Sequence, residues 1–246
     1  MKLLDHGSLD LVEAWGSDER IIESARMSTD KGFKGWGTPE VPGDEKLLRY
    51  LWKNGHHTPF EMAGATFEVQ APIFVFRQWH RHRTQSYNEL SARYTELPDL
   101  FYIPSRERIL AGKQSTTNKQ GSEAGFSEAE TDRIKDYFHD AALDTHNAYT
   151  DLLHRGVSKE LARAVLPVSV YSKMRASANL RNWLHFVSLR TDPHAQYEIR
   201  VYAEAIESCL REKFPHAMEV YREKDYKLID CGELGVGVKW NPLEKE

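Results

Sequence analysis

The sequence predicts an α+β fold in which a mostly antiparallel twisted sheet packs against helices. Residues 64–71 and 168–177 alternate apolar and polar side chains, which is typical of half-buried strands. Helical periodicity fills much of the remaining chain, without the regular strand–helix–strand order of a parallel sheet. With 246 residues, of which 40% are hydrophobic and 28% are charged, the composition is ordinary for a globular protein. We therefore expect a single domain over residues 1–246.

The N-terminal quarter is predicted to be helical with one interruption. Residues 8–15 and 18–27 both suggest short amphipathic helices with polar starts. Residues 32–43 contain four glycines and two prolines, which predicts a loop that we expect to be mobile. Residues 44–54 carry a stripe of leucines and are followed by Gly55, a residue that commonly ends helices.

The middle of the chain combines strands with helices. After the strand at 64–71, Pro72 can begin a helix that continues through Trp79 into the following arginine-rich segment. Residues 100–104 are a candidate for a short strand, and residues 111–127 are predicted to be a mobile surface loop. Residues 128–155 have helical periodicity and precede a glycine.

The C-terminal half is predicted to return to the sheet and then to form helices. The strand at 168–177 should join the same sheet, and residues 179–189 and 194–214 should form two helices. The glycines near the end of the chain are expected in turns; they are Gly232, Gly235 and Gly237.

The composition also limits the cellular setting. The first residues lack the apolar stretch of a signal peptide, and no run is long enough to cross a bilayer, so we expect no membrane partner. Cys209 and Cys231 have no spacing typical of a disulfide framework or a metal site. Two scattered cysteines are typical of a reducing environment, which indicates a cytoplasmic protein.

The segment from Arg81 to Tyr94 is the most informative part of the chain. It reads Arg-His-Arg-Thr-Gln-Ser-Tyr-Asn-Glu-Leu-Ser-Ala-Arg-Tyr and is too polar to suggest a core segment. A second basic island runs from Ser158 to Thr191, although the net charge of the chain is −4. Guanidinium groups match the geometry of phosphate and stay charged. The two islands therefore predict a concentrated site for an oxygen-rich anion.

Other interpretations of these residues are weaker. A metal could be held by histidines and an acid, but no HExxH pattern is present and we expect no metal; the candidate ligands are His56, His57, Glu61, His80 and His82. Single-stranded nucleic acid could stack on aromatic residues of the basic island, namely Trp79, Tyr87 and Tyr94. The negative net charge and the confinement of basic residues to two islands disfavour nucleic acid as a partner.

No nucleophile or phosphate loop stands out. Cys209 lies on a predicted helix, where a small buried hydrophobic role is more common than catalysis. The chain contains no Walker sequence and no GxGxxG pattern after a strand. Ser91 has no dedicated base in the local sequence, so we expect it to donate a hydrogen bond rather than attack a substrate.

The Arg-His-Arg triplet, separated from Ser91 by seven residues, resembles the signature of the flavin-dependent thymidylate synthases, the ThyX family. Further segments resemble the family in the same order, over a region from about Ser24 to about Pro215; they are residues 55–61, 71–79, 88–94, 161–167 and 189–196. The resemblance implies a ThyX-like fold with a helical subdomain. It also implies a methyltransferase that converts dUMP to dTMP.

The resemblance further implies the cofactors and the assembly. The carbon donor would be 5,10-methylenetetrahydrofolate, and a noncovalent FAD, reduced by NADPH, would supply the hydride. Members of the family are homotetramers whose active sites combine residues from several subunits. Two basic islands far apart in the sequence can meet in such a site.

Site residues are carried over position by position. Those matching FAD positions are Ser28, Thr58, Arg81, His82, Arg83, Glu89, Asn179, Arg181 and His185. Those matching dUMP positions are Gln78, Ser91, Ala92, Arg93, Arg163 and Arg190. Arg190 is the expected catalytic residue, because a cation against the uracil ring can stabilise negative charge that develops there. His56 matches a histidine near the flavin and the folate.

Three features depart from the shorter family pattern. Ala92 stands where glycine is frequent, which is tolerable if the ligand contacts only the backbone N–H. His185 stands where some members have asparagine. The loops at 32–43 and 111–127 are enlarged, and the sequence suggests no function for either.

Overall fold

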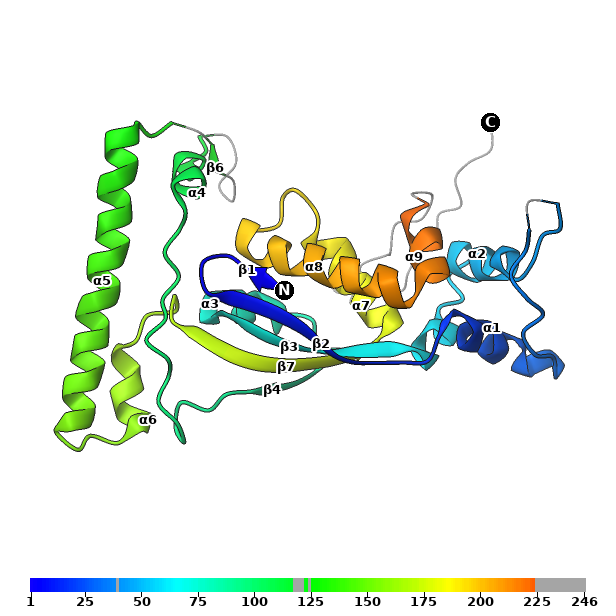
Figure 1. Cartoon of the computed structure of the whole chain (residues 1–246), viewed down its shortest axis with the longest axis horizontal. Helices are drawn as coiled ribbons and strands as arrows, with labels where there is room; N and C mark the ends of the chain where they lie inside the picture. Colours follow the sequence, from blue (N-terminus) through cyan, green and yellow to red (C-terminus); the bar gives the residue numbers. More distant parts are fainter. Residues whose placement is uncertain (39, 117–121, 124, 224–246) are drawn as a thin grey trace, which may run out of the picture.

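The computed structural model describes residues 1–38, 40–116, 122–123 and 125–223. Its main sheet is entirely antiparallel, as predicted, and has the strand order β1-β2-β3-β7-β4 (Figure 1). The strands of this sheet are β1 (Lys2–Leu3), β2 (Gly7–Trp15), β3 (Gly64–Pro72), β4 (Ser86–Glu89) and β7 (Tyr171–Asn179). The α+β class is therefore confirmed.

Helices cover one face of this sheet and enclose the core (Figure 1). They are α3 (Ile73–Trp79), α7 (Leu180–Arg190), α8 (Tyr197–Lys213) and α9 (Pro215–Arg222). Alternate residues of the central strands point toward these helices and are buried. Phe67 of β3 packs edge-on against Trp183, with ring centroids 5.0 Å apart, and Phe186 lies 4.6 Å from Trp79. This aromatic layer fixes α7 against both the sheet and α3.

Further helices lie beyond the two ends of the sheet (Figure 1). At one end are α1 (Asp18–Arg26), η1 (Met27–Thr29), α2 (Glu45–Lys53) and η2 (Thr58–Met62). At the other are α4 (Arg106–Leu110), α5 (Glu128–His154), α6 (Lys159–Ala162) and η3 (Arg163–Val165). Close to α4 lies a small hairpin formed by β5 (Lys113–Gln114) and β6 (Ser122–Glu123).

The prediction of a helix at 8–15 is wrong, because this segment forms β2. Its backbone pairs with β3 from Ser8 opposite Gln70 to Trp15 opposite Gly64. The register shifts between Leu11 and Glu13, which inserts an extra residue into the strand. The bulge places two apolar residues in succession and breaks the alternation that identifies a strand. The resulting spacing imitates a helical stripe.

The predicted strand at 100–104 is reduced to one isolated bridge between Phe101 and Val170. The amide of Tyr102 still donates to the carbonyl of Ser169 over 2.9 Å. The next amide, that of Ile103, donates to the Asp5 carboxylate over 2.8 Å instead of extending a ladder. Pro104 then has no N–H to offer. A short pairing is the result.

The remaining predicted helices and strands are present within a few residues of their expected bounds. The helix that begins after Pro72 ends at Trp79, before the arginine triplet. Cys209 is buried, as expected, whereas Cys231 and the three glycines that follow it lie outside the described residues. No helix within the described part of the chain is both long and apolar enough to cross a membrane.

Contacts hold much of the predicted loop at 32–43. The Glu45 carboxylate accepts from the amides of Gly37 and Gly43, at 2.9 and 2.7 Å. Trp36 donates to Glu19 over 2.8 Å and stacks on the His216 ring at 3.8 Å. The mobility expected of this loop stays a prediction. The loop predicted at 111–127 contains the β5–β6 hairpin in its described part.

Candidate functional site

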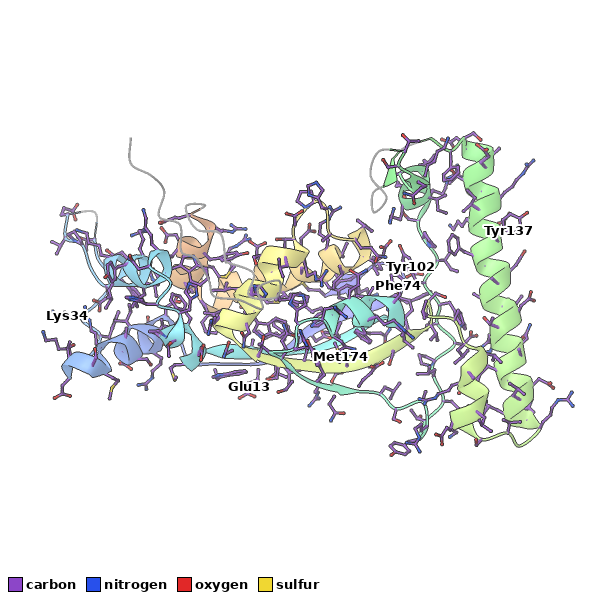
Figure 2. All side chains as sticks on the ribbon, turned by 180° about the vertical axis from the view of Figure 1, so that it is seen from behind. Glu13, Lys34, Phe74, Tyr102, Tyr137 and Met174 are labelled. Atoms are coloured by element: carbon purple, nitrogen blue, oxygen red, sulfur yellow. The ribbon has the colours of Figure 1, made fainter. Side chains whose placement is uncertain are left out.

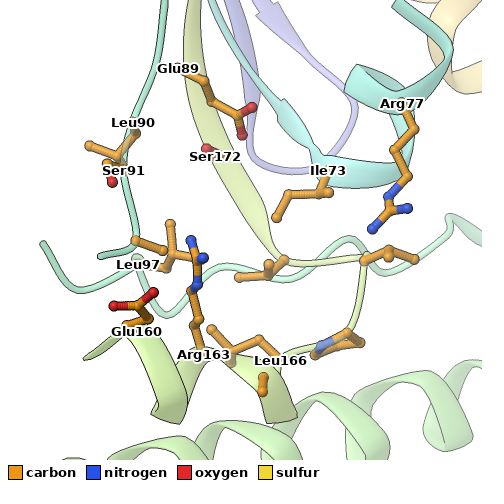
Figure 3. Close-up of a pocket in the computed structure, with 15 residues that line it drawn as sticks. Ile73, Arg77, Glu89, Leu90, Ser91, Leu97, Glu160, Arg163, Leu166 and Ser172 are labelled. Carbon is orange, nitrogen blue, oxygen red and sulfur yellow. The ribbon is translucent and has the colours of Figure 1, made fainter. Parts of the chain in front are cut away.

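A cleft of about 610 Å³ lies between the end of β4, the start of α3 and the α6–η3 turn (Figure 3). Four residues singled out in the sequence line it, and they come from both basic islands; they are Glu89, Ser91, Ala92 and Arg163. Figure 3 shows Arg77 entering the same space from α3, with Glu160 on the opposite wall. The structure therefore brings together residues that are more than 70 positions apart in the chain.

A turn after β4 presents Ser91 to this cleft. Pairing with β7 continues as far as Leu90, whose amide donates to the carbonyl of Lys173 over 2.8 Å. The carbonyl of Ser91 then accepts from the amides of Tyr94 and Thr95, at 3.0 and 3.1 Å. Its hydroxyl accepts from the amide of Arg93 over 3.3 Å. No base within the described chain contacts this hydroxyl, so Ser91 is equipped as a hydrogen-bonding group.

The charges around the cleft are mixed. Arg93 reaches Glu160 over 3.3 Å across the cleft mouth, and both side chains are about half exposed. Exposed ion pairs of this kind contribute little energy, so an incoming anion can displace Glu160 from Arg93. Arg77 and Arg163 add two further exposed guanidiniums. The cleft thus has the donors for a phosphate group.

Sequence reasoning missed Arg77 and Glu160. The neighbour of Arg77, Gln78, was identified because it matches a family position. Successive residues of a helix point about 100° apart, so the two side chains of α3 face different surroundings. Glu160 belongs to the second island as its sole acid. A single acid among basic residues was the feature of the sequence that could have identified Glu160.

A second group of predicted residues surrounds Arg190. Its Nε donates to Nε2 of His82 over 2.9 Å, and its Nη2 donates to the main-chain carbonyl of Gln78 over 3.1 Å. Because Nε2 of His82 accepts here, its proton lies on the other ring nitrogen and the imidazole is neutral. His82 is only 7% exposed, so the expectation that the Arg81–Tyr94 segment stays out of the core is wrong at this residue.

The guanidinium of Arg190 keeps an uncompensated charge. No carboxylate of the described residues forms an ion pair with it. Burial, together with the nearby Arg81, lowers the pKa of Arg190 below its ordinary value. A partly buried cation held by two neutral acceptors favours an anionic ligand, because that ligand supplies the missing countercharge.

A third group gathers around the start of α7. Asn179 caps this helix by accepting from the amide of Asn182 over 3.0 Å. The side chain of Asn182 in turn donates to the carbonyl of Thr84 over 3.1 Å. Arg181 pairs with Glu61 of η2, the element that begins at Thr58. The predicted flavin residues on α7 therefore adjoin both η2 and the end of the arginine triplet.

The remaining predicted flavin positions extend this group. His185 lies with its ring 6.0 Å from that of His82. Ser28 lies in η1, directly after α1, and α1 packs against η2. His56 precedes η2 and meets the Tyr50 ring edge-on at 5.9 Å. Glu89 is the exception, since it lies in the cleft with Ser91 and Arg163.

The donor set around α7 fits a flavin dinucleotide. Arg81 and Arg83 are exposed on either side of the buried His82, and neither forms an ion pair within the described part of the chain. Two unpaired guanidiniums beside a helix N-terminus suit the diphosphate of FAD. Hydroxyl and amide groups nearby can orient the rest of the molecule, and they belong to Ser28, Thr58 and Asn179.

The predicted dUMP residues do not form one group in a single chain. Ser91, Ala92 and Arg163 line the cleft, with Arg93 at its mouth. Among the residues that the structure describes, Gln78 and Arg190 lie outside that lining. A site that uses all of them needs a ligand that spans both groups or residues from a second chain.

The alternative interpretations gain no support. Within the described residues no group of three or more His, Cys, Asp or Glu side chains could hold a metal ion. His80 instead contacts the sulfur of Met174 at 3.2 Å. Trp79 is fully buried, and the Tyr87 hydroxyl donates to the His82 carbonyl over 2.6 Å. Of the three proposed stacking residues only Tyr94 is freely exposed.

Comparisons with known proteins identify the family. Residues 10–216 match the family described as thymidylate synthase complementing protein. A protein of Wolbachia pipientis wMel named flavin-dependent thymidylate synthase is 41% identical over 222 residues, which cover 90% of this chain and 76% of the relative. One of the same name from Thermosipho africanus is 42% identical over 234 residues, covering 94% of this chain and 99% of the relative.

Solved structures give the same fold. The UMP/dUMP methylase PolB from Streptomyces cacaoi, bound with 5-Br dUMP, superposes with a TM-score of 0.78 at 33% identity. The match covers 90% of this chain and 97% of that one. The same methylase bound with 5-Br UMP gives a TM-score of 0.77 at 34% identity, covering 90% of this chain and 96% of that one.

Proposed function

Because the chain belongs to the thymidylate synthase complementing protein family, that of the flavin-dependent thymidylate synthases, we propose that it methylates dUMP reductively to dTMP. The observation that carries the proposal is the cleft that gathers Ser91, Ala92 and Arg163 from the two basic islands. The resemblance assigns dUMP to these positions. The related methylase PolB was solved with a dUMP analogue, which supports the same substrate here.

The phosphate of dUMP binds in this cleft. Arg163 and Arg93 supply charge-assisted hydrogen bonds, and the Ser91 hydroxyl donates a neutral one. Ala92 is buried and small, so its backbone can approach the ligand closely. Arg77 adds a further positive charge from the α3 side of the cleft. Binding of the phosphate replaces the weak contact between Arg93 and Glu160.

Arg190 is the residue that acts on the base. Removal of a proton or addition at the pyrimidine leaves negative charge on the uracil ring, and a fixed cation stabilises that charge. His82 and the Gln78 carbonyl hold the guanidinium in place without neutralising it. The stabilisation is therefore available before the reaction begins, which is the requirement for electrostatic preorganisation.

FAD, when bound, supplies the hydride, so the protein needs no nucleophile of its own. Arg81, Arg83 and the residues at the start of α7 hold it noncovalently. Ser91 has no base, and burial raises the pKa of the Cys209 thiol, which disfavours the reactive thiolate. We assign NADPH as the reductant of the flavin and 5,10-methylenetetrahydrofolate as the carbon donor. His56 lies on the flavin side of the site.

The active enzyme is a homotetramer with shared sites. Gln78 and Arg190 lie outside the cleft that holds Ser91 and Arg163, so residues of a second subunit complete each site. Helix α5 supports association, because Tyr137 is 75% exposed and Leu143 is 50% exposed on it. Figure 2 shows Tyr137 pointing away from the rest of the chain. Exposed apolar side chains of this size are typical of protein interfaces.

The proposal is tested with the purified protein. We expect bound or reconstituted FAD with a flavin absorption spectrum that bleaches when NADPH is added. Formation of dTMP should require dUMP, 5,10-methylenetetrahydrofolate, FAD and NADPH together, and omission of each in turn is the control. Protein that cannot be reconstituted with FAD and forms no dTMP contradicts the proposal. Salt-sensitive binding of single-stranded DNA would support the nucleic-acid alternative instead.

A further inference from the structure

The structure buries a carboxylate next to the candidate site that the proposed function leaves unexplained. Glu198, in the first turn of α8, is only 3% exposed. One oxygen, Oε1, accepts from the Tyr102 hydroxyl over 2.9 Å and from Nε of Arg108 over 2.8 Å. The other oxygen, Oε2, accepts from Nε2 of Gln196 over 2.8 Å. A buried carboxylate with three donors has a fixed orientation.

This carboxylate remains ionised at neutral pH. Burial by itself would raise the pKa of Glu198, but the hydrogen bond and the charge of Arg108 outweigh it and hold the pKa below its ordinary value. An ionised carboxylate can only accept hydrogen bonds. Its neighbour Gln196 must therefore turn its NH₂ group toward Glu198.

The orientation of the Gln196 amide in turn sets that of Gln78, a residue of the candidate site. With Nε2 of Gln196 committed to Glu198, its Oε1 faces Gln78 and accepts from Nε2 of Gln78. The amide of Gln78 thereby has a defined direction, and its Oε1 has no hydrogen-bond partner among the described residues. The main-chain carbonyl of Gln78 holds Arg190 over 3.1 Å. The free oxygen therefore lies on the residue that also anchors Arg190.

We propose that Glu198 and Gln196 are positioning residues that set the amide direction of Gln78, so that Oε1 of Gln78 faces the nucleotide as an acceptor. The inference rests on the proposed function, because it assigns the free oxygen to an N–H of dUMP. Without this control, the amide of Gln78 is free to turn. It then presents its NH₂ group, a donor, to the ligand's own donor.

The test reverses the donor-to-acceptor direction of the hydrogen bonds that link Gln78, Gln196 and Glu198, and then restores it. In Glu198→Gln the new amide can donate to Gln196, which then turns, and Gln78 turns in response. In the double variant Gln196→Glu/Glu198→Gln the carboxylate and the amide exchange places. The new carboxylate at 196 accepts from both neighbours, so Gln78 regains its original direction while the net charge is the same as in the original chain.

We expect Glu198→Gln to weaken dUMP binding to the FAD-loaded protein about tenfold, the factor for one misdirected buried hydrogen bond. The exchange variant should recover most of this loss. Dissociation constants come from calorimetric titration with dUMP, and FAD content and thermal unfolding are measured on each variant. Glu204→Gln is the matched control, because Glu204 is exposed on the same helix outside the chain of hydrogen bonds, and it should bind dUMP normally.

Gln196→Ala keeps the test decisive if the buried substitutions impair folding. Gln196 is exposed, and its removal leaves Glu198 with Tyr102 and Arg108. We expect about threefold weaker dUMP binding, because Gln78 then samples both directions. Unchanged binding in Gln196→Ala, or an exchange variant no better than a folded Glu198→Gln, overturns the inference. An original chain that binds FAD but not dUMP contradicts the proposed function instead.

Discussion

Arg190 differs from the arginines that form ion pairs in the described chain because its hydrogen-bond partners are neutral. In those ion pairs the arginine donates to a carboxylate, as Arg175 donates to Glu68 over 3.0 Å. Arg190 instead donates to an imidazole nitrogen and to a carbonyl oxygen. These two contacts fix the position of the guanidinium, and neither of them neutralises its charge. This combination is what a group that stabilises transient negative charge requires.

Replacing Arg190 tests that role. Arg190→Ala should lower single-turnover dTMP formation about 10²- to 10³-fold, the usual cost of removing one preorganised electrostatic group. The FAD content should stay largely unchanged, because among the predicted flavin residues only His82 is hydrogen-bonded to this side chain, while Asn179 and Arg181 have contacts of their own. Arg190→Lys, which keeps the charge but loses the two directed contacts, should be intermediate. Turnover that survives in Arg190→Ala would show that the uracil assignment is wrong.

Replacing Arg163 tests a different step, the binding of the dUMP phosphate. If it holds the phosphate, Arg163→Ala should weaken dUMP binding about 10- to 100-fold, as expected for the loss of a charge-assisted hydrogen bond. Arg175→Ala removes the same charge from the strand next to the cleft and is the control, since Arg175 is paired with Glu68. Both dissociation constants are measured by titration at one salt concentration. Equal effects of the two changes would indicate a general charge effect rather than a contact.

At this scale the resemblance gives candidate residues for the site but not their grouping in space. Matching positions gave Ser91, Ala92 and Arg163, which the structure places together. The same matching gives Glu89 a flavin role, which stays a prediction, and the structure places Glu89 in the lining of that cleft. A position in a motif carries no distance, so neither the division of the site nor the entry of Arg77 into the cleft could be predicted from the sequence.

At the scale of elements, the errors fall where pairing overrides local pattern. The segment 8–15 has the composition of an amphipathic helix, but hydrogen bonds to β3 along its length fix it as a strand. Strand β4 was missed because all four of its residues, Ser86–Glu89, are half-buried or exposed and lack an apolar alternation. The helices α5, α7 and α8 were predicted well, because their periodicity is long enough to be unambiguous.

A glycine at the start of β3 gives a stability prediction. A Cβ on Gly64 would lie 2.2 Å from the Trp15 ring and 2.5 Å from the carbonyl oxygen of Ala178. Gly64→Ala should therefore destabilise the fold by about 1–3 kcal/mol, the usual cost of overpacking. Urea unfolding followed by circular dichroism measures this change.

The matched control is Gly32→Ala. Gly32 has no heavy atom within 4 Å of the added Cβ and lies in the loop after η1. Its replacement should change the free energy of unfolding by less than about 0.5 kcal/mol. If both variants unfold at the same urea concentration as the original chain, the close approach of β2, β3 and β7 at this point is incorrect.

At the scale of the whole molecule, the two groups of nucleotide residues predict complementation between subunits. Arg163→Ala and Arg190→Ala should each be strongly impaired as pure proteins when they are assayed at a dUMP concentration that just saturates the original protein. If each site takes Arg163 from one subunit and Arg190 from another, some sites in a mixed oligomer receive Arg163 from the Arg190→Ala subunit and Arg190 from the Arg163→Ala subunit. Such a site contains both arginines. Co-expression of the two variants with different affinity tags should therefore restore part of the activity.

Tandem purification through both tags confirms that mixed oligomers were assayed. Mixed oligomers without activity would show that Arg163 and Arg190 act within one chain. Neither outcome can be read from the sequence, because a resemblance of positions is silent on which subunit supplies each residue. The sequence also does not show which apolar side chains of α5 are exposed, because this depends on how little of the helix packs against the rest of the chain.

The triplet Arg81–His82–Arg83 also has a consequence for evolution and design. Its central residue is buried and hydrogen-bonded to Arg190, while the two residues beside it are exposed. Mutations at His82 therefore alter the scaffold and the chemistry together, whereas mutations at Arg81 and Arg83 leave the scaffold intact. A mutant library confined to the two outer positions would explore new cofactors without loss of folded protein, and adaptation to a different flavin would begin there.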